Sequence, residues 1–237
     1  VALNCVANGK ILRNGKFENI WIQPAAGDAG GSLGAALGLW HIELKKNRTI
    51  NSKDSMNGSY LGPVYSQSEV EKKLEEIGAN FEVLDDEQLI EKTVLELSHD
   101  KAVGWFQGRM EFGPRALGCR SILGDARSEN MQKTLNLKVK FRESFRPFAP
   151  SIIREDLLSW FDLNCDSPYM LLVSDVRNEK RRLMTEKEKD LFGIDKLNIK
   201  SSKQIYQFRH LLNFIFYFIG LCFFYKVIST RYKSHVY

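Results

Sequence analysis

The fold is decided by residues 101–118, KAVGWFQGRMEFGPRALG, in which an apolar run is followed at once by glycines and arginines. The run predicts a buried strand over 102–107. The glycines after it let the backbone approach a ligand closely. Arg109 and Arg115 offer planar, permanently charged groups that match phosphate or carboxylate oxygens. This stretch therefore predicts a strand that leads into a loop for a small anion, most simply a phosphate compound.

Positive charge gathers a second time before Pro147, in Lys138, Lys140, Arg142 and Arg146. We interpret Lys140 and Arg146 as further anion contacts and the other two as part of a solvated helix face. For Arg109 and Arg115 a plain ion pair with Glu111 or Asp125 is an open alternative, because surface pairs are common and contribute little.

A stretch of small residues at 24–38, PAAGDAGGSLGAALG, predicts a helix that ends near Ile42 or Leu44. Asp28 within it has two interpretations. It can cap the helix by accepting backbone N–H bonds. Alternatively, it can hold a cation where small residues such as Gly30 and Gly31 bring backbone N–H groups to a nucleotide phosphate. The spacing matches neither the P-loop nor the GxGxxG pattern.

Capping signals and periodicity predict the remaining helices. Ser66 with Glu69 begins a helix that stops at Gly78. A second helix covers 86–97, and Ser128 caps a third.

Strands and a linker complete the prediction. Apolar runs predict strands over 1–7, 19–23 and 168–175, and the polar residues 46–59 have the composition of a linker. The chain is therefore expected to be mixed α/β in two segments.

Composition places the chain among globular proteins, because 43% of its 237 residues are hydrophobic and 27% are charged. The net charge of +5 suits small anionic ligands and does not imply nucleic acid, since 29 acidic residues are interleaved with the basic ones. The four cysteines form no CxxC pair, so we expect a reducing compartment, the cytoplasm, and neither disulfides nor zinc. No signal peptide is visible, and we expect a piece of a longer protein.

The character of the chain changes from about Ser201. Residues 211–225 are almost wholly apolar and aromatic, but the run falls short of the roughly 20 residues that span a bilayer core. Membrane contact is expected only through this tail, if at all. A core element or a non-native extension is the preferred interpretation.

Several long stretches together resemble the O-carbamoyltransferase family of nodulation-factor and antibiotic carbamoyltransferases. The matching stretches are 2–9 (ALNCVANG), 21–31 (WIQPAAGDAGG), 104–124, 139–151 (VKFRESFRPFAPS) and 167–171 (SPYML). The resemblance covers residues 1 to about 200 and identifies the chain as a carboxy-terminal fragment.

The resemblance implies an α/β fold in which the end of an actin-like ATPase-fold domain is followed by an incomplete YrdC-like α/β domain. The boundaries are 1–48 for the actin-like part, 49–65 for a linker, 66–200 for the YrdC-like part and 201–237 for a divergent apolar tail. The YrdC-like part is expected to make carbamoyl-adenylate from carbamoyl phosphate and ATP. The actin-like domain is expected to pass the carbamoyl group to a hydroxyl of a small molecule or oligosaccharide.

The site residues follow from the same resemblance. Asp28 corresponds to an aspartate ligand of the metal, iron or another divalent ion. Arg115, Lys140 and Arg146 correspond to the catalytic contacts with carbamoyl phosphate and ATP. The cofactor-binding positions are Gly30, Gly31 and Arg109.

The chain departs from the family pattern at both ends. The family's two histidine metal ligands lie in an amino-terminal portion that does not occur here, and the segments that complete the second site are missing from 201–237. We therefore expect the parent enzyme to be a carbamoyltransferase and this polypeptide alone to be inactive. The alternative is a non-catalytic nucleotide- or anion-binding remnant.

Overall fold

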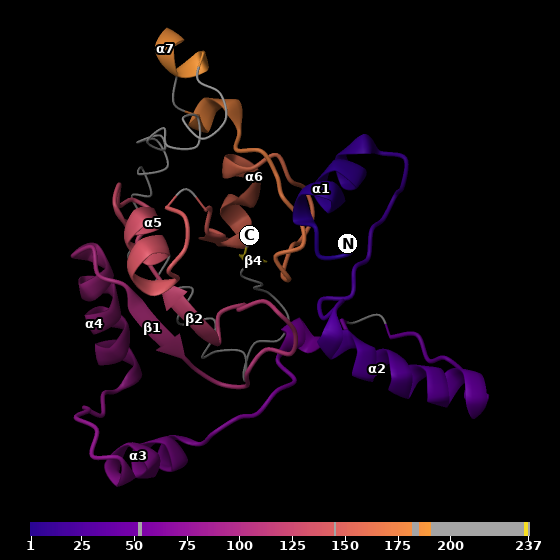
Figure 1. Cartoon of the computed structure of the whole chain (residues 1–237), viewed down its shortest axis with the longest axis horizontal. Helices are drawn as coiled ribbons and strands as arrows, with labels where there is room; N and C mark the ends of the chain where they lie inside the picture. Colours follow the sequence, from indigo (N-terminus) through magenta and orange to yellow (C-terminus); the bar gives the residue numbers. More distant parts are fainter. Residues whose placement is uncertain (52–53, 145, 182–184, 191–234, 237) are drawn as a thin grey trace.

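The computed structural model describes residues 1–51, 54–144, 146–181, 185–190 and 235–236. The protein contains a small antiparallel sheet of β1 (Val103–Phe106) and β2 (Arg120–Leu123), in which Val103 pairs with Leu123 and Phe106 with Arg120. Helix α4 (Asp86–Ser98) lies beside this sheet (Figure 1). The predicted strand over 102–107 and the α/β class are thus confirmed.

The core of this part lies between α4 and the sheet. Ile90, Val94 and Leu97 occupy one face of α4 and pack with Trp105 of β1 in a single buried cluster. Apolar side chains at helical spacing bury themselves together because each removes surface from water. The cluster fixes the direction in which β1 delivers the chain to the loop that follows it.

The three helices predicted from capping signals and periodicity are present, and capping boxes explain where two of them begin. Helix α3 (Gln67–Glu76) begins with a capping box in which Ser66 accepts from the N–H of Glu69 and Glu69 accepts from that of Ser66. The hydrogen bonds that the backbone N–H and the hydroxyl of Ser66 donate to the carboxylate lower the pKa of Glu69. Asp85 caps α4 in the same way with Gln88. The third helix, α5 (Met131–Thr134), continues as η3 (Leu135–Val139). Its N-cap is Asn130 and not Ser128, although the Ser128 hydroxyl accepts from the N–H of Met131 at 3.1 Å.

The amino-terminal part contains helices where the sequence predicted a strand. Residues 5–14 form α1 (Cys5–Asn14), so the strand expected over 1–7 is wrong. The reason is local: the side chain of Asn4 accepts from the N–H of Ala7 and caps a helix, which a short apolar run does not reveal. Gly15, with a φ of 69°, ends the helix in the left-handed region.

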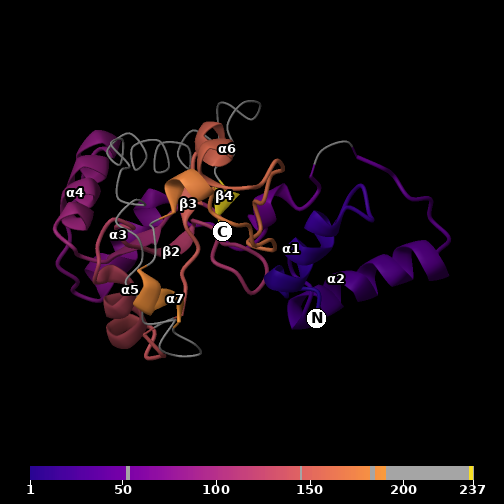
Figure 2. The ribbon, with the colours of Figure 1, turned by 90° about the horizontal axis from the view of Figure 1, so that it is seen from above.

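Helix α2 (Asp28–Gly38) continues as η1 (Leu39–Glu43), which confirms the helix predicted to end near Ile42 or Leu44. It projects from the rest of the molecule (Figures 1 and 2). Beyond it, the short helix η2 (Asn57–Ser59) brings the chain back to the sheet region.

The strands expected over 19–23 and 168–175 are wrong, since the structure assigns neither to a strand. In the second segment the carbonyls of Leu171 and Val173 accept hydrogen bonds from the side chains of Asn8 and Arg13. Backbone carbonyls that find side-chain partners do not need a neighbouring strand. The first segment ends in a turn, in which the carbonyl of Gln23 accepts from the N–H of Ala26 at 3.0 Å.

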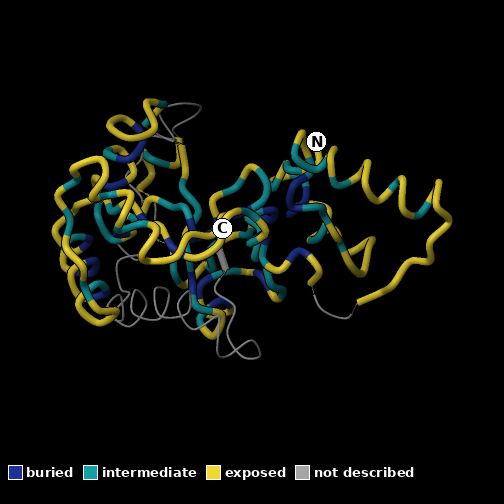
Figure 3. Tube along the Cα trace, turned by 90° about the horizontal axis from the view of Figure 1, so that it is seen from below, coloured by how far each residue is buried: buried dark blue, intermediate teal, exposed yellow. Residues whose placement is uncertain are grey.

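The carboxy-terminal part is built from short elements around a second core. They are β3 (Ser151–Ile152), η4 (Arg154–Asp156), α6 (Leu157–Trp160), η5 (Asn178–Lys180), α7 (Glu186–Lys189) and β4 (His235–Val236), which pairs with β3. Ile152, Leu157 and Trp160 form the buried centre, and Leu12 of α1 packs against it. Helix α1 is thereby attached to the carboxy-terminal part. Figure 3 shows how the buried residues are distributed along the chain.

The apolar run 211–225 lies outside the described residues, so its predicted character stays a prediction. Among the helices that the structure describes, none has the length and apolar composition that a membrane crossing requires.

Candidate anion site on the arginine loop

Residues 107–119, which join β1 to β2, form what we call the arginine loop. A buried carboxylate, Glu111, holds its shape: one oxygen accepts from the backbone N–H groups of Leu117 at 2.8 Å, Cys119 at 2.7 Å and Arg120 at 3.4 Å. Charged acceptors make strong hydrogen bonds to backbone N–H groups. The acid in this basic loop is therefore structural. This role of Glu111 was not predicted from the sequence. The feature that could have indicated it is a single acidic residue among the glycines of the loop.

Arg120 closes the neck of the arginine loop. Its guanidinium donates to the carbonyls of Gln107 at 2.7 Å and Gly108 at 3.2 Å, and its Cζ lies 3.4 Å from the ring centroid of Phe106. A cation over an aromatic face is attracted by the ring. Arg120 thus fixes the two ends of the loop and is the second residue that sequence reasoning missed.

Residues 54–63 lie along one side of the arginine loop. The N–H of Phe112 donates to Ser59 at 2.6 Å, that of Gly62 to Met110 at 2.9 Å, and the hydroxyl of Tyr60 to the carbonyl of Leu117 at 3.0 Å. Three consecutive residues here, Asn57 to Ser59, have positive φ angles. Such backbone persists only where surrounding contacts hold it. The interval predicted as a linker therefore contains a wall of the site.

The amino-terminal segment also contacts the arginine loop. At Gly113, with a φ of 123°, an added Cβ would lie 3.3 Å from the Cα of Ala25. The guanidinium of Arg115 donates from Nη2 to the carbonyl of Leu3 at 3.3 Å. The stretches 2–9, 21–31 and 104–124, far apart in sequence, therefore meet at this loop.

The two arginines of the loop differ in their surroundings. Arg109 is exposed and donates from Nη1 to the carbonyl of Gly62 at 2.8 Å. Arg115 is half-buried, and its buried Nε has no hydrogen-bond partner within the described part of the chain. A buried, unpaired N–H is costly unless a ligand or water satisfies it. Arg115 is therefore the stronger candidate for an anion contact.

The ion-pair alternative for these arginines is wrong. Glu111 is occupied by backbone N–H groups, and Asp125 pairs with Arg127, whose Nη2 lies 2.7 Å from the carboxylate and whose Nε lies 3.0 Å from each of its oxygens. Neither acid is thus available to pair with Arg115.

Lys140 and Arg146 follow η3, which begins beyond the far end of β2. Arg146 forms an exposed ion pair with Glu143 at 2.8 Å. The pKa of Glu143 is lowered by a hydrogen bond from its own backbone N–H and by the charge of Arg146. Across residues 54–144 and 146–181, no hydrogen bond or ion pair joins Lys140 or Arg146 to the arginine loop. Their roles at the site stay predictions.

The fully buried Asn136 positions this second basic segment. Its amide donates to the carbonyls of Ser144 at 3.0 Å and Arg146 at 2.9 Å, and its oxygen accepts from Nε of Arg142 at 2.6 Å. Arg142, expected on a solvated face, is instead half-buried and lies over the ring of Phe148.

Asp28 is the exposed first residue of α2, while Gly27 is the N-cap and makes no side-chain cap bond, so the capping interpretation is wrong. Wherever the structure places the chain, three or more His, Cys, Asp or Glu side chains never gather as metal ligands would. One exposed carboxylate does not make a metal site, because structural and catalytic sites need three or four protein ligands. Metal binding at Asp28 stays a prediction for the longer protein.

The two glycines after Asp28 have different surroundings. A Cβ on Gly30 would lie 2.3 Å from the carbonyl oxygen of Ala25, so packing alone requires a glycine there. Gly31 has open space around it, which leaves room for a ligand to approach its backbone. A cofactor contact stays a prediction for both.

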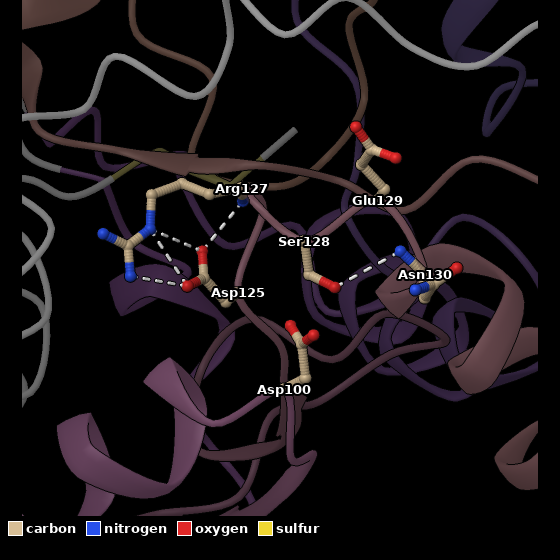
Figure 4. Close-up of a pocket in the computed structure, with 6 residues that line it drawn as sticks. All are labelled: Asp100, Asp125, Arg127, Ser128, Glu129 and Asn130. Carbon is tan, nitrogen blue, oxygen red and sulfur yellow. Dashed lines mark hydrogen bonds and ion pairs between the residues drawn. The ribbon is translucent and has the colours of Figure 1, made fainter.

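The opposite end of the sheet has the opposite charge. A hollow of about 560 Å³ is lined by Asp100, Asp125, Arg127, Ser128, Glu129 and Asn130 (Figure 4). Asp100 precedes β1, and the other five follow β2. Its one arginine is held by Asp125, and the remaining carboxylates repel phosphate. The arginine loop is therefore the better candidate for anion binding.

Comparison with known protein families shows which family the chain belongs to. Residues 94–204 match the family model of the carbamoyltransferase C-terminus, and residues 1–37 match that of the carbamoyltransferase N-terminus. The two matches together cover more than half of the chain, including the arginine loop and the segment that packs on it. The chain belongs to the carbamoyltransferase family.

Individual relatives agree. The chain is 56% identical over 205 residues to an uncharacterized protein of Synechocystis sp., covering 86% of the chain and 33% of that protein. It is 41% identical over 188 residues to nodulation protein NolNO of Sinorhizobium fredii, covering 78% and 27%. It is 33% identical over 177 residues to 3'-hydroxymethylcephem-O-carbamoyltransferase of Streptomyces clavuligerus, covering 75% and 31%. The chain thus spans about a third of the length of these relatives.

Proposed function

We propose that this chain is the carboxy-terminal part of an O-carbamoyltransferase and that its arginine loop binds carbamoyl phosphate together with ATP. The observation that carries the proposal is the unpaired donor of Arg115, on a loop whose own acid is satisfied by backbone N–H groups. Phosphate and carboxylate oxygens are the partners that a guanidinium fits best. The similarity to 3'-hydroxymethylcephem-O-carbamoyltransferase supports the choice of a carbamoyl compound as the anion.

In this proposal the second domain activates the carbamoyl group and the actin-like domain transfers it. Residues 66–200 belong to a YrdC-like domain, in which Arg115, Lys140 and Arg146 contact the phosphates while carbamoyl-adenylate forms. Preorganised positive charge lowers the barrier where negative charge develops on a leaving phosphate. Residues 1–48 complete an actin-like domain, where Asp28 takes part in binding iron or another divalent metal and a hydroxyl of a small molecule or oligosaccharide accepts the carbamoyl group.

The cytoplasm is the proposed site of this reaction. The described cysteines Cys5, Cys119 and Cys165 form no disulfide with one another, and cysteines that stay reduced fit a reducing compartment. Burial and the charge of Asp166 raise the pKa of the Cys165 thiol, which makes it a poor nucleophile at neutral pH.

Calorimetry tests the binding step on the whole chain. Carbamoyl phosphate is titrated into the protein with and without ATP, and we expect saturable binding that Arg115→Ala weakens. Arg127→Ala, at the other end of the sheet, is the matched control and should bind as the parent does. Absence of binding to a folded sample would contradict the proposal.

A non-catalytic anion-binding remnant is the second candidate, because Asp28 has no gathered metal ligands within the described residues. Pyrophosphate release separates the two. Release from ATP that depends on carbamoyl phosphate indicates catalysis, whereas binding without release indicates the remnant.

A further inference from the structure

We propose that Tyr169 is a positioning residue for the anion site, because its hydroxyl holds the wall at residues 54–63 in place against the arginine loop. The inference rests on the proposed function and deepens it, since it concerns how the loop is kept ready for carbamoyl phosphate. Tyr169 is half-buried and lies in the stretch 167–171, far along the chain from both the wall and the loop.

The hydroxyl of Tyr169 bonds to the turn at the start of the wall. It accepts from the N–H of Gly58 at 3.1 Å and donates to the carboxylate of Asp54. The same carboxylate accepts from the N–H groups of Met56 at 3.0 Å and of Gly58 at 3.4 Å. Tyr169 and Asp54 together therefore hold the turn over residues 54–59.

The turn needs this support because its backbone is strained. Asn57, Gly58 and Ser59 have φ angles of 48°, 70° and 64°. Residues other than glycine rarely adopt a positive φ, and they keep it only where surrounding contacts hold them. Met170, next to Tyr169, has a φ of 53°. Strained backbone thus lies on both sides of the bond between Tyr169 and the turn, and such strain is typical of places where geometry serves a function.

The turn transmits its position to the loop through Ser59. The carbonyl of Ser59 accepts from the N–H of Phe112 at 2.6 Å, and Phe112 precedes Arg115 by three residues. Without the hydroxyl of Tyr169 the turn is free to relax toward ordinary backbone angles, which moves the carbonyl of Ser59 away from Phe112. The part of the loop that carries Arg115 then loses a fixed neighbour.

A second attachment runs from the same segment to the amino-terminal residues. The carbonyl of Leu171 accepts from the side-chain amide of Asn8 at 3.1 Å, and this amide also donates to the carbonyl of Ala2 at 2.9 Å. The neighbouring Leu3 contacts the arginine loop. The segment that carries Tyr169 is therefore attached to both parts of the chain that contact this loop.

Hydrogen exchange on the whole chain tests the support without a ligand. Tyr169→Phe keeps the ring and removes only the hydroxyl. We expect the amides of Gly58 and Phe112 to exchange about tenfold faster, which corresponds to the loss of one ordinary hydrogen bond. The amides of α4 should keep their rates, because α4 packs in the core formed with β1. Tyr65→Phe, at an exposed tyrosine whose ring lies beside that of Phe106, is the matched control and should change none of these rates.

Calorimetry on the folded variants tests the consequence for binding. Tyr169→Phe should weaken the affinity for carbamoyl phosphate roughly three- to tenfold, because a donor that is no longer held in place must be ordered when the ligand binds. In an Arg115→Ala background the same change should alter the affinity by less than about twofold, since a positioning residue acts through the group that it positions. A residue that only stabilised the fold would leave the affinity of the folded protein unchanged.

Asp54 offers a second pair of variants at the other end of the bond from Tyr169. Asp54→Ala removes the acceptor of the hydroxyl and should reproduce both effects. Asp54→Asn keeps an acceptor oxygen and should give smaller changes. Asp54 is exposed, so neither substitution opens a cavity in a core.

The outcomes separate this inference from the proposed function. Absence of carbamoyl phosphate binding by the parent chain defeats the proposed function and the inference with it. Binding by the parent, together with unchanged exchange at Phe112 or unchanged affinity in Tyr169→Phe, overturns the inference alone. Equal acceleration of the α4 amides, or an undiminished effect in the Arg115→Ala background, would also overturn it, because Tyr169 would then act on the whole fold.

Discussion

The two ends of the β1–β2 sheet treat a buried carboxylate in opposite ways. At the arginine loop, Glu111 accepts from three backbone N–H groups, and it therefore forms no ion pair with Arg109 or Arg115. At the hollow, Asp125 is satisfied by the side chain of Arg127. Both acids are almost fully buried. A buried acid that accepts from backbone N–H groups leaves the charge of neighbouring arginines unneutralised. A buried acid that pairs with an arginine neutralises that charge.

The largest effect is expected from removing the carboxylate of Glu111, which holds the arginine loop. Glu111→Ala leaves three converging N–H groups without an acceptor and should lower the free energy of unfolding by about 3 kcal/mol. Glu111→Gln keeps an oxygen at the same place and should lose about 1–2 kcal/mol. Urea denaturation measures both. Equal stability of Glu111→Ala and the parent would show that the N–H groups have other partners.

Removing the free charge should cost binding. Arg115→Ala is expected to weaken the affinity for carbamoyl phosphate by about ten- to hundredfold, or about 1.5–3 kcal/mol, because a charge-assisted contact is lost. Arg109→Ala should cost less, because Arg109 is exposed. The control is Arg127→Ala, whose charge is already neutralised by Asp125. Equal losses in the two loop variants, measured by calorimetry, would refute the assignment within the loop.

Gly113→Ala tests the contact between the loop and the amino-terminal segment. A side chain at a φ of 123° is strained, and its Cβ would press on Ala25. We expect a loss of about 1–3 kcal/mol in the free energy of unfolding. Gly34→Ala, in open space inside α2, should instead stabilise by about 0.5–1 kcal/mol. A Gly113→Ala variant as stable as the parent would mean that this contact is not made.

The smallest effect concerns Arg146, which is tied to an acid as Arg127 is, but at the surface. The lowered pKa of Glu143 keeps the pair intact above the ordinary value of 4.5, and it breaks as the pH falls through the lowered value. Glu143→Gln should free Arg146 at neutral pH and raise the affinity for carbamoyl phosphate by at most about threefold. Glu186→Gln, in the similar exposed pair with Lys189, is the control. A tenfold change would show that Glu143 has a larger part in the site.

Elements whose signals are local were predictable from the sequence. The capping boxes at Ser66 and Asp85 lie within four residues of the N–H groups they satisfy, so α3 and α4 followed from pattern alone. The strand before the arginine loop followed from its apolar run. The strands expected over 1–7 and 168–175 failed because the decisive partners, Asn4 and Asn8, are single polar side chains whose bonds outweigh an apolar pattern.

The candidate site was predictable only where its residues are contiguous. The basic, glycine-rich loop pointed to an anion, and the structure leaves Arg115 with a free donor. The wall at 54–63 was not predictable, because its bonds to Phe112 and Leu117 join segments roughly fifty residues apart. The role of Glu111 was equally hidden, since an acid beside arginines is most often an ion-pair partner.

The hydrogen bonds between α1 and residues 171–173 have a consequence for folding during synthesis. Asn8 and Arg13 bond to carbonyls 163 and 160 residues further along, and Leu12 packs on the cluster of Ile152 and Trp160. At the roughly 5–20 residues per second of synthesis, α1 leaves the ribosome about 8–30 s before those partners exist. During this interval the apolar side of α1 is not yet covered by its partners. We therefore expect chaperones to bind nascent chains that are stalled before Leu171.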